Sequence, residues 1–310
     1  MILTFTPNPA VDKTIFMQSI ALGAVNRVKE SQLDPGGKGI NVSRMVNHLE
    51  WPTMALGFLA GDIGHLVQTS LSSEGVPNQF VFVPGQTRLN ITIMDETTQT
   101  GTSFFDEGPF ISPSFLEAMD HIVAKWLRTA QVFVLAGALP PGLPQGVYAT
   151  YIQMARSKGV TAILDAHGEP LKYGIGALPY LIKPNVSEAE ELLERKLPTE
   201  DAIIAAAKEL RARGIAVVVI SMGAKGAICA NSDVVWKAIP PKVEPKSTVG
   251  SGDSMVAGLA IAIAQRQNIL EGLRLGTAAG AATAMTPGTS LGTLAEVKSL
   301  LGQVKIEQID

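Results

Sequence analysis

The stretch Ser247-Thr248-Val249-Gly250-Ser251-Gly252-Asp253-Ser254 leads directly into an apolar segment that predicts a helix over residues 252–265. Two glycines one residue apart allow the backbone to turn tightly and to approach a ligand without hindrance from a Cβ atom. The N–H groups of Gly250, Ser251 and Gly252 would then point at one spot, where the helix dipole also favours negative charge. The stretch therefore predicts an anion-binding turn at the start of an apolar helix.

Asp253 lies within this turn, where its carboxylate would repel the anion that the turn attracts. The conflict is resolved if the carboxylate accepts the proton of a hydroxyl group that attacks a bound phosphate. An acidic residue at the start of a helix can also serve only to cap it. The eight residues alone leave both interpretations open.

A second glycine-rich segment, Pro35-Gly36-Gly37-Lys38-Gly39-Ile40-Asn41-Val42-Ser43, leads into a helix that we expect over residues 39–49. Lys38 adds a positive charge, and Asn41 in the first helical turn can form hydrogen bonds with hydroxyl groups. Such a loop suits a polyol that carries an anionic group. A plain glycine turn with an exposed lysine would have the same sequence, so this segment alone does not decide.

The rest of the chain alternates between short apolar runs and helical periodicities. Strands are predicted at residues 2–5, 132–136, 161–164, 180–182 and 217–221, and further helices at residues 113–126, 145–158, 188–193, 200–213, 271–285 and 294–301. Ser187-x-x-Glu190 and Thr293-x-x-Glu296 have the spacing of capping boxes. Strands that are apolar throughout and alternate with helices predict an α/β fold, with a mostly parallel sheet and helices on both faces.

Two insertions break this alternation, at about residues 12–34 and 80–108. Their extended pattern, as in Leu89-Asn90-Ile91-Thr92-Ile93-Met94, predicts antiparallel strands with one face toward water. We expect them to form a small β-sheet at the edge of one α/β domain that spans residues 1–310. Such a sheet could cover a site as a lid or could pair two subunits.

The composition excludes several classes of protein. The 310 residues carry a formal net charge of −3 without a basic stripe, so nucleic acid is not an expected partner. Cys229 is the single cysteine, which rules out a disulfide framework and a cysteine-rich zinc site. The N-terminus does not resemble a signal peptide, and the longest weakly polar stretch, residues 255–264, is too short to span a membrane. We therefore expect a soluble, cytoplasmic protein without a membrane partner.

Familiar nucleotide-binding motifs are absent from the sequence. It contains no GxxxxGK[ST] loop, no GxGxxG after a strand and no GxSxG elbow. However, the two glycine-rich segments together resemble the two signatures of the phosphofructokinase-B family, in the ribokinase-like superfamily. Further segments resemble the sugar-phosphate kinase branch of that family, in the same order along the chain, at residues 6–12, 87–90, 137–142, 164–165 and 183–188.

This resemblance implies an ATP-dependent kinase with a Rossmann-like sheet and a β-sheet lid, through which subunits often pair as a homodimer. It assigns catalysis to the base Asp253 and to an anion hole formed by Gly250, Ser251 and Gly252. The residues implied for the sugar phosphate are Asp12, Gly37, Lys38, Asn41, Asn90 and Arg88, with Arg88 holding the phosphate. The residues implied for ATP are Lys183, Asn185, Ser221, Gly223 and Gly226. Mg²⁺ would be organised through water by Asn185 and Glu188.

Several of these residues also allow simpler roles. Glu188 could only favour the start of its helix, and Asp12 could cap a turn. Arg88 could pair with Asp106 or Glu107 across the lid. His167 and Cys229 are expected to be structural, and Lys225 to be exposed in a turn.

The chain also departs from the family pattern. Ala138 stands where some relatives have serine, and residues 102–104 lack an arginine that some relatives have. Phosphate binding then depends more heavily on Arg88 and Lys38, and on Arg27 if that side chain reaches across a dimer.

The expected reaction is in-line transfer of the ATP γ-phosphoryl group to a ketohexose phosphate. Fructose 1-phosphate is our first choice of acceptor, which would give fructose 1,6-bisphosphate. Fructose 6-phosphate and tagatose 6-phosphate fit the same features, and no residue spacing separates them. A hypothesis from another class is a non-catalytic sensor of sugar phosphates, although a sensor would not need a base beside an anion hole.

Overall fold

The structure is a computed structural model that describes residues 1–98, 100–232 and 234–309. In this part of the chain, a 10-stranded sheet has the strand order β14-β13-β12-β11-β10-β9-β8-β1-β4-β5. Its strands are β1 (Ile2–Thr6), β4 (Thr53–Ala60), β5 (Asn78–Val83), β8 (Val132–Ala136), β9 (Thr161–Asp165), β10 (Leu181–Ile182), β11 (Val217–Ser221), β12 (Ala227–Asn231), β13 (Val234–Ile239) and β14 (Lys305–Gln308).

Neighbouring strands are parallel from β5 to β11 and antiparallel from β11 to β14. The chain leaves β1 toward β4 and β5 and later returns to β8 on the other side of β1. This reversal makes a topological switch point between β1 and β8. In open α/β sheets, ligands bind at such a point, beyond the carboxyl ends of the strands.

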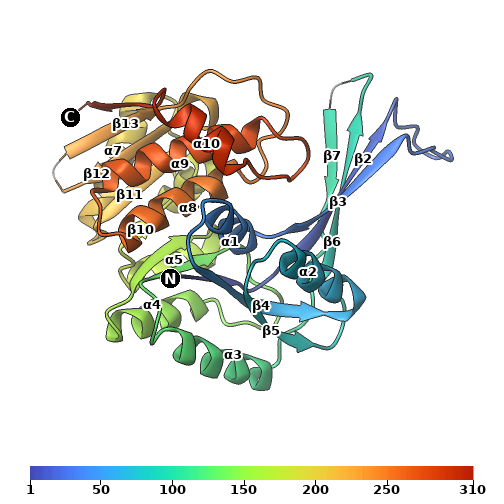
Figure 1. The fold of residues 1–310 in the computed structure, drawn as a ribbon, viewed down its shortest axis with the longest axis horizontal. Helices are drawn as coiled ribbons and strands as arrows, with labels where there is room; N and C mark the ends of the chain where they lie inside the picture. Colours follow the sequence, from blue (N-terminus) through green and yellow to red (C-terminus); the bar gives the residue numbers. More distant parts are fainter. Residues whose placement is uncertain (99, 233, 310) are drawn as a thin grey trace.

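Helices cover both faces of this sheet, as the sequence predicts (Figure 1). One face carries α1 (Lys38–His48), α2 (Gly61–Ser73), α8 (Ser251–Ala264), α9 (Ile269–Ala284) and α10 (Leu294–Leu301). The other face carries α3 (Pro113–Trp126), α4 (Val147–Ser157), α5 (Gly168–Gly176), α6 (Val186–Leu193) and α7 (Glu200–Ala212). A short 3₁₀ helix, η1 (Gly223–Lys225), follows β11.

The predicted strands and helices are confirmed, with ends shifted by at most about two residues, but β4, α2, α5 and the antiparallel strands β12–β14 were not predicted. Glycine explains the two missed helices. Helix α2 starts at Gly61 and contains Gly64, and α5 contains Gly168, Gly174 and Gly176. Glycine has a low helix propensity, so these helices depend on packing against the sheet.

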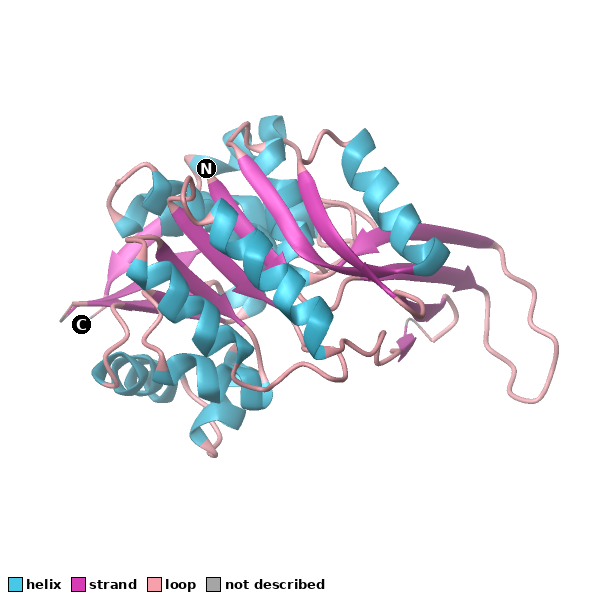
Figure 2. Ribbon diagram, turned by 90° about the horizontal axis from the view of Figure 1, so that it is seen from below, coloured by secondary structure: helices cyan, strands magenta, loops and turns pink. Residues whose placement is uncertain are grey.

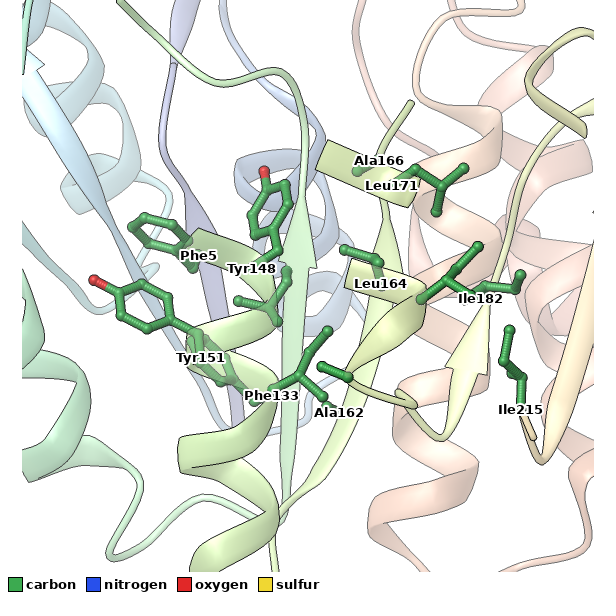
Figure 3. Packing of buried hydrophobic residues seen from close by; sticks show 14 of the residues in the cluster. Phe5, Phe133, Tyr148, Tyr151, Ala162, Leu164, Ala166, Leu171, Ile182 and Ile215 are labelled. Atoms are coloured by element: carbon green, nitrogen blue, oxygen red, sulfur yellow. The ribbon is translucent and has the colours of Figure 1, made fainter. Parts of the chain in front are cut away.

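An aromatic cluster anchors the centre of the sheet to α4 (Figure 3). Phe5 of β1 packs edge-to-face against Tyr148 and Tyr151, with ring centroids 6.3 and 5.0 Å apart. Tyr148 is fully buried, and its hydroxyl donates a 2.9 Å hydrogen bond to the carbonyl oxygen of Gly137, just after β8. The core thus fixes a loop at the carboxyl edge of the sheet, where the site described below lies.

A second, 4-stranded sheet projects from one end of the molecule (Figure 2). Its order is β3-β2-β6-β7, with strands β2 (Ala10–Met17), β3 (Glu30–Gly36), β6 (Arg88–Asp95) and β7 (Thr100–Phe104). Strands β2 and β6 pair in parallel, whereas the other pairs are antiparallel. The expectation of antiparallel pairing alone was therefore wrong. Both strands leave the carboxyl ends of parallel strands, β1 and β5, and so they run in the same direction.

Residues 80–83, which the sequence analysis placed in the small sheet, belong to β5 of the main sheet. Phe80 and Val83 are buried there. The described helices include none that is both long and apolar enough to cross a membrane.

Candidate active site

The two glycine-rich segments meet at the carboxyl edge of the main sheet. Gly250 is the N-cap of α8 and Gly37 is the N-cap of α1, and both have positive φ, +77° and +116°. Glycine is needed at Gly37 for a second reason, because a Cβ atom there would lie 2.9 Å from the Thr6 methyl group. Two helix N-termini thus open on the same region, where their dipoles favour an anion.

The turn from Gly250 to Gly252 is held by close packing of α8 against α9. A Cβ atom on Gly280 of α9 would lie 2.9 Å from the carbonyl oxygen of Ser251. Gly250 is the N-cap, and Asp253 lies three residues later in the first turn, so Asp253 is not the cap of this helix. The capping interpretation of Asp253 is therefore wrong, and its carboxylate is available for another role.

Asp253 is buried in the first turn of α8, where it accepts a 2.8 Å hydrogen bond from Asn41 Nδ2. Burial raises the pKa of Asp253 to about 6, and the neighbouring Asp165 carboxylate adds to the rise. The ammonium groups of Lys38 and Lys183 and the bond from Asn41 oppose it. A carboxylate with a pKa near 6 is ionised at neutral pH and is suited to accept a proton.

A buried charge network lies beside Asp253. Lys38 Nζ is 3.0 Å from Asp165 Oδ1 and 3.0 Å from Glu188 Oε1, and Lys183 Nζ is 3.4 Å from Asp165 Oδ2. Burial alone would raise the pKa of Asp165, but Lys183 and Lys38 lower it below its ordinary value. Burial lowers the pKa of Lys38, but Asp165 and Glu188 raise it further, so Lys38 stays charged.

Asp165 was not predicted as a site residue from the sequence. The available signal was its position, because it is an acidic residue that ends an apolar strand of a parallel sheet. Lys38, expected at the sugar phosphate, forms ion pairs with Asp165 and Glu188 in this structure.

Asn185 and Glu188 form the capping box of α6. Asn185 Oδ1 accepts a hydrogen bond from the Glu188 N–H group at 2.9 Å, and Glu188 Oε2 accepts one from the Asn185 N–H group at 2.8 Å. The box predicted at Ser187 and Glu190 was wrong by two residues, since the helix begins at Val186. Glu188 therefore does stabilise its helix, and its other oxygen faces Lys38.

The donor set near Glu188 is compatible with Mg²⁺ carried by a nucleotide. Within residues 1–98, 100–232 and 234–309, no group of three or more His, Cys, Asp or Glu side chains could hold a metal ion by itself. Mg²⁺ is usually bound by one or two carboxylates together with substrate phosphates and water. The carboxylate of Glu188 and the amide oxygen of Asn185 are oxygen donors of this kind.

One face of the small sheet carries the residues expected at the sugar. Asp34, Asp12 and Asn90 lie in register across β3, β2 and β6. Asn90 Nδ2 donates a 2.8 Å hydrogen bond to Asp12 Oδ1. Asp12 is part of β2 and so does not cap a turn. Burial raises the pKa of Asp12, while the bond from Asn90 and the charge of Arg88 oppose the rise.

Arg88 begins β6 next to this row, and its Nη2 atom donates a 2.9 Å hydrogen bond to the Asn8 carbonyl oxygen. Burial lowers its pKa, against the opposing charges of Asp12 and Asp106. In the described part of the chain, no ion pair joins Arg88 to Asp106 or Glu107, and its buried Nε atom has no hydrogen-bond partner. An unpaired buried donor is costly unless a ligand satisfies it.

Other buried polar atoms in this region also lack a partner among the described residues. They include Asn41 Oδ1, Asn90 Oδ1 and Ser251 Oγ. Buried polar groups are nearly always hydrogen-bonded, so unsatisfied groups require an explanation. A bound polyol phosphate would supply both donors and acceptors for them.

A pocket of about 460 Å³ opens beside the charge network, at the carboxyl end of β11. Its lining includes Asn185, Ser221 and Gly223 of the predicted nucleotide set, and also the exposed Lys225. Lys183 is not in this lining but lies next to Gly252, because a Cβ atom on Gly252 would be 3.4 Å from the Lys183 Nζ atom. Gly226 has a packing reason of its own, because a Cβ atom there would overlap the Ala238 carbonyl oxygen.

The chain is similar to known carbohydrate kinases in sequence and in fold. Residues 6–295 match the family described as pfkB family carbohydrate kinase. The chain is 35% identical to 1-phosphofructokinase of Escherichia coli over 99% of this chain and 98% of that protein, and 34% identical to 1-phosphofructokinase of Borreliella burgdorferi over 100% and 99%. The crystal structure of Escherichia coli phosphofructokinase-2 in complex with potassium superposes with a TM-score of 0.91 at 29% identity, over 97% of this chain and 98% of that one.

Proposed function

The chain belongs to the pfkB family of carbohydrate kinases, and on this premise we propose that it phosphorylates fructose 1-phosphate to fructose 1,6-bisphosphate. It is an ATP-dependent fructose phosphate kinase, a phosphotransferase with a hydroxyl group as acceptor. The relatives named 1-phosphofructokinase share more sequence with it than the phosphofructokinase-2 structure does, which favours the 1-phosphate. Fructose 6-phosphate and tagatose 6-phosphate are the alternative acceptors.

The observation that carries the catalytic proposal is the buried carboxylate of Asp253 directly behind the Gly250–Gly252 turn. Asp253 accepts the proton of the attacking sugar hydroxyl as the new O–P bond forms and ADP leaves. Such proton transfer contributes about 10²–10⁴ to the rate. The N–H groups of Gly250, Ser251 and Gly252 stabilise the charge on the migrating phosphoryl group, and each donor of this kind is worth about 10²–10³.

The sugar phosphate would lie between the small sheet and the first turn of α1. Arg88 holds its phosphate, for which the unpaired Nε atom supports a charge-assisted bond. The hydroxyl groups of the sugar would meet Asp12, Asn90 and Asn41, and the backbone at Gly37. Asn90 and Asn41 already donate hydrogen bonds to Asp12 and Asp253, so the orientation of these side chains is fixed before the substrate binds.

ATP would occupy the pocket at β11, with Asn185, Ser221 and Gly223 in its wall. Lys183, which lies beside Gly252, would meet its phosphates, and Gly226 would shape the turn that follows η1. Asn185 and Glu188 would hold Mg²⁺, through water. When bound, Mg²⁺ neutralises negative charge on the phosphates.

The small sheet would act as a lid and as the surface of a homodimer. Its outer face carries the row Leu33, Lys13, Ile91 and Phe104, in which Leu33 and Phe104 are more than half exposed. Exposed apolar side chains on a sheet face support an interaction surface, here with Lys13 between Leu33 and Ile91. Closure of the other face over the sugar would exclude water, which otherwise competes as the phosphoryl acceptor.

A coupled assay of ADP release tests the proposal. It compares fructose 1-phosphate, fructose 6-phosphate and tagatose 6-phosphate at matched concentrations. We expect the highest kcat/KM with fructose 1-phosphate. A higher value with either 6-phosphate would overturn the choice of acceptor. Sugar-phosphate binding without ADP release from any of the three would instead favour a sensor.

A further inference from the structure

Lys38 connects three elements of the candidate site through a single ammonium group. It begins α1, while Asp165 ends β9 and Glu188 lies in the first turn of α6. Lys38 Nζ is 3.0 Å from an oxygen of each carboxylate, so these two oxygens are no more than twice that distance apart. Two carboxylates so close together would repel each other without a cation between them.

The charge of this network depends on Lys38. Asp165 is fully buried and the Glu188 side chain is only 13% exposed, so water screens their charges poorly. With Asp253 the network has three carboxylates, and Lys38 and Lys183 supply two positive charges. The sum is −1 with Lys38 and −2 without it. Loss of this one charge would therefore leave a negative pocket with two oxygen donors, which suits a divalent cation.

We propose that Lys38 is an internal cation that keeps the Asp165–Glu188 pair closed to free divalent metal ions, so that metal enters the site only together with nucleotide phosphates. This rests on the proposed role of Glu188 toward Mg²⁺. The Lys38 side chain is 28% exposed and is carried on a flexible stem, so it can leave the pair. Nucleotide phosphates offer its ammonium group a new partner at the moment the metal arrives.

Two other roles for Lys38 make different predictions. If Lys38 only binds the sugar phosphate, its loss raises the KM for the sugar and creates no metal site. If the ion pairs only stabilise the fold, its loss lowers the melting temperature and again creates no metal site. Binding of metal in the absence of nucleotide therefore separates these roles from the proposal.

The test is a titration of the full chain with Mn²⁺ at neutral pH without nucleotide, in which free Mn²⁺ is measured by electron paramagnetic resonance. We expect Lys38→Met to bind a single Mn²⁺ per chain, about tenfold or more tightly than the wild type, since a like charge has been removed at close range. Lys38→Arg keeps the charge and should behave as the wild type. Adding Glu188→Gln to Lys38→Met should abolish the new site, because the glutamine keeps the helix cap but not the charge.

Three outcomes would overturn the proposal: Mn²⁺ binding by the wild type that Glu188→Gln removes, no gain of binding in Lys38→Met, or a gain that Glu188→Gln leaves intact. Circular dichroism checks the fold of each variant. If Lys38→Met does not fold, Lys38→Gln takes its place, since its amide can still donate to one carboxylate. A wild type that releases ADP while Lys38→Met gains no Mn²⁺ site overturns this inference alone, whereas a wild type without phosphoryl transfer overturns the proposed function.

Discussion

Asn41 Nδ2 donates a 2.8 Å hydrogen bond to Asp253 Oδ2, across 212 residues of sequence. This bond joins the first turn of α1 to the first turn of α8, so the two glycine-rich segments form one site. It orients the carboxylate, and it favours the ionised form that can accept a proton. Asp253 is thus buried enough for a raised pKa, yet supported enough to stay ionised at neutral pH.

The pH dependence of turnover should report the pKa of Asp253. Because the pKa of Asp253 in the unliganded protein is about 6 and the ionised form is the base, kcat/KM should fall as the pH decreases through about 6. Asn41→Leu removes a bond that lowers this pKa, so the acidic limb should move to higher pH. The measurement is kcat/KM for the sugar phosphate against pH, which reports the ionisation of the free enzyme. An acidic limb that is unchanged in Asn41→Leu would show that this bond does not tune the base.

Asp253→Asn should abolish nearly all turnover and at the same time stabilise the protein. The folded state raises the pKa of Asp253 from 3.8 to about 6, so ionisation of this group opposes folding. The stabilisation of the fold that comes with a protonated Asp253 is fully present below pH 3.8. It is lost as the pH rises through about 6. At 1.36 kcal/mol per unit, the asparagine variant should be more stable at pH 7 by about 3 kcal/mol.

Urea unfolding of wild type and Asp253→Asn at several pH values measures this difference. It should be negligible below the ordinary aspartate pKa and largest above pH 6. A difference that does not change with pH would contradict the assigned pKa. Retained binding of ATP and sugar phosphate by the variant is the control for an intact site.

Arg88→Met should raise the KM for the sugar phosphate, because the buried Nε donor and its charge are lost. Hydrogen bonds to charged groups are worth about 1.5–3 kcal/mol, which corresponds to roughly 10- to 100-fold. The KM for ATP should stay near the wild-type value. Arg156→Met, which changes an exposed arginine on α4, is the matched control. If Arg88→Met raised the KM for ATP instead, Arg88 would belong to the nucleotide site.

Glu188→Gln should weaken the response to Mg²⁺ while keeping the start of α6 intact, because glutamine at this position can still form the capping box. The measurement is the Mg²⁺ concentration that gives half-maximal activity at fixed ATP, and we expect it to rise. Glu296→Gln makes the same change in the capping box of α10 and should leave this concentration unaltered. Equal effects of the two substitutions would mean that Glu188 acts only on its helix.

The sequence could predict elements whose signals are local. The Thr293–Glu296 capping box and the proline at the start of α3 place helix ends correctly, and the apolar runs of β8 and β11 give strands with the predicted limits. The box at Ser187 failed because Asn185 and Glu188 have the same spacing two residues earlier, and the helix uses that pair. Local patterns cannot make that choice.

Site residues that lie within one sequence motif could be predicted. Site residues that only the fold brings together could not. Asp253 and Asn41 each follow a glycine turn, so both could be chosen from the sequence. The partners of Lys38 lie 127 and 150 residues away, and only the order of strands in the sheet brings Asp165 and Glu188 to it. The glycine-rich segment and the family resemblance therefore suggested only a sugar contact for Lys38.

The most direct test of the proposed mechanism is a crystal structure of the protein with a non-hydrolysable ATP analogue and fructose 1-phosphate. We expect the terminal phosphate within hydrogen-bond distance of the N–H groups of Gly250, Ser251 and Gly252, with the acceptor hydroxyl of the sugar against the Asp253 carboxylate. A terminal phosphate bound away from this turn, or an acceptor hydroxyl out of reach of Asp253, would contradict it.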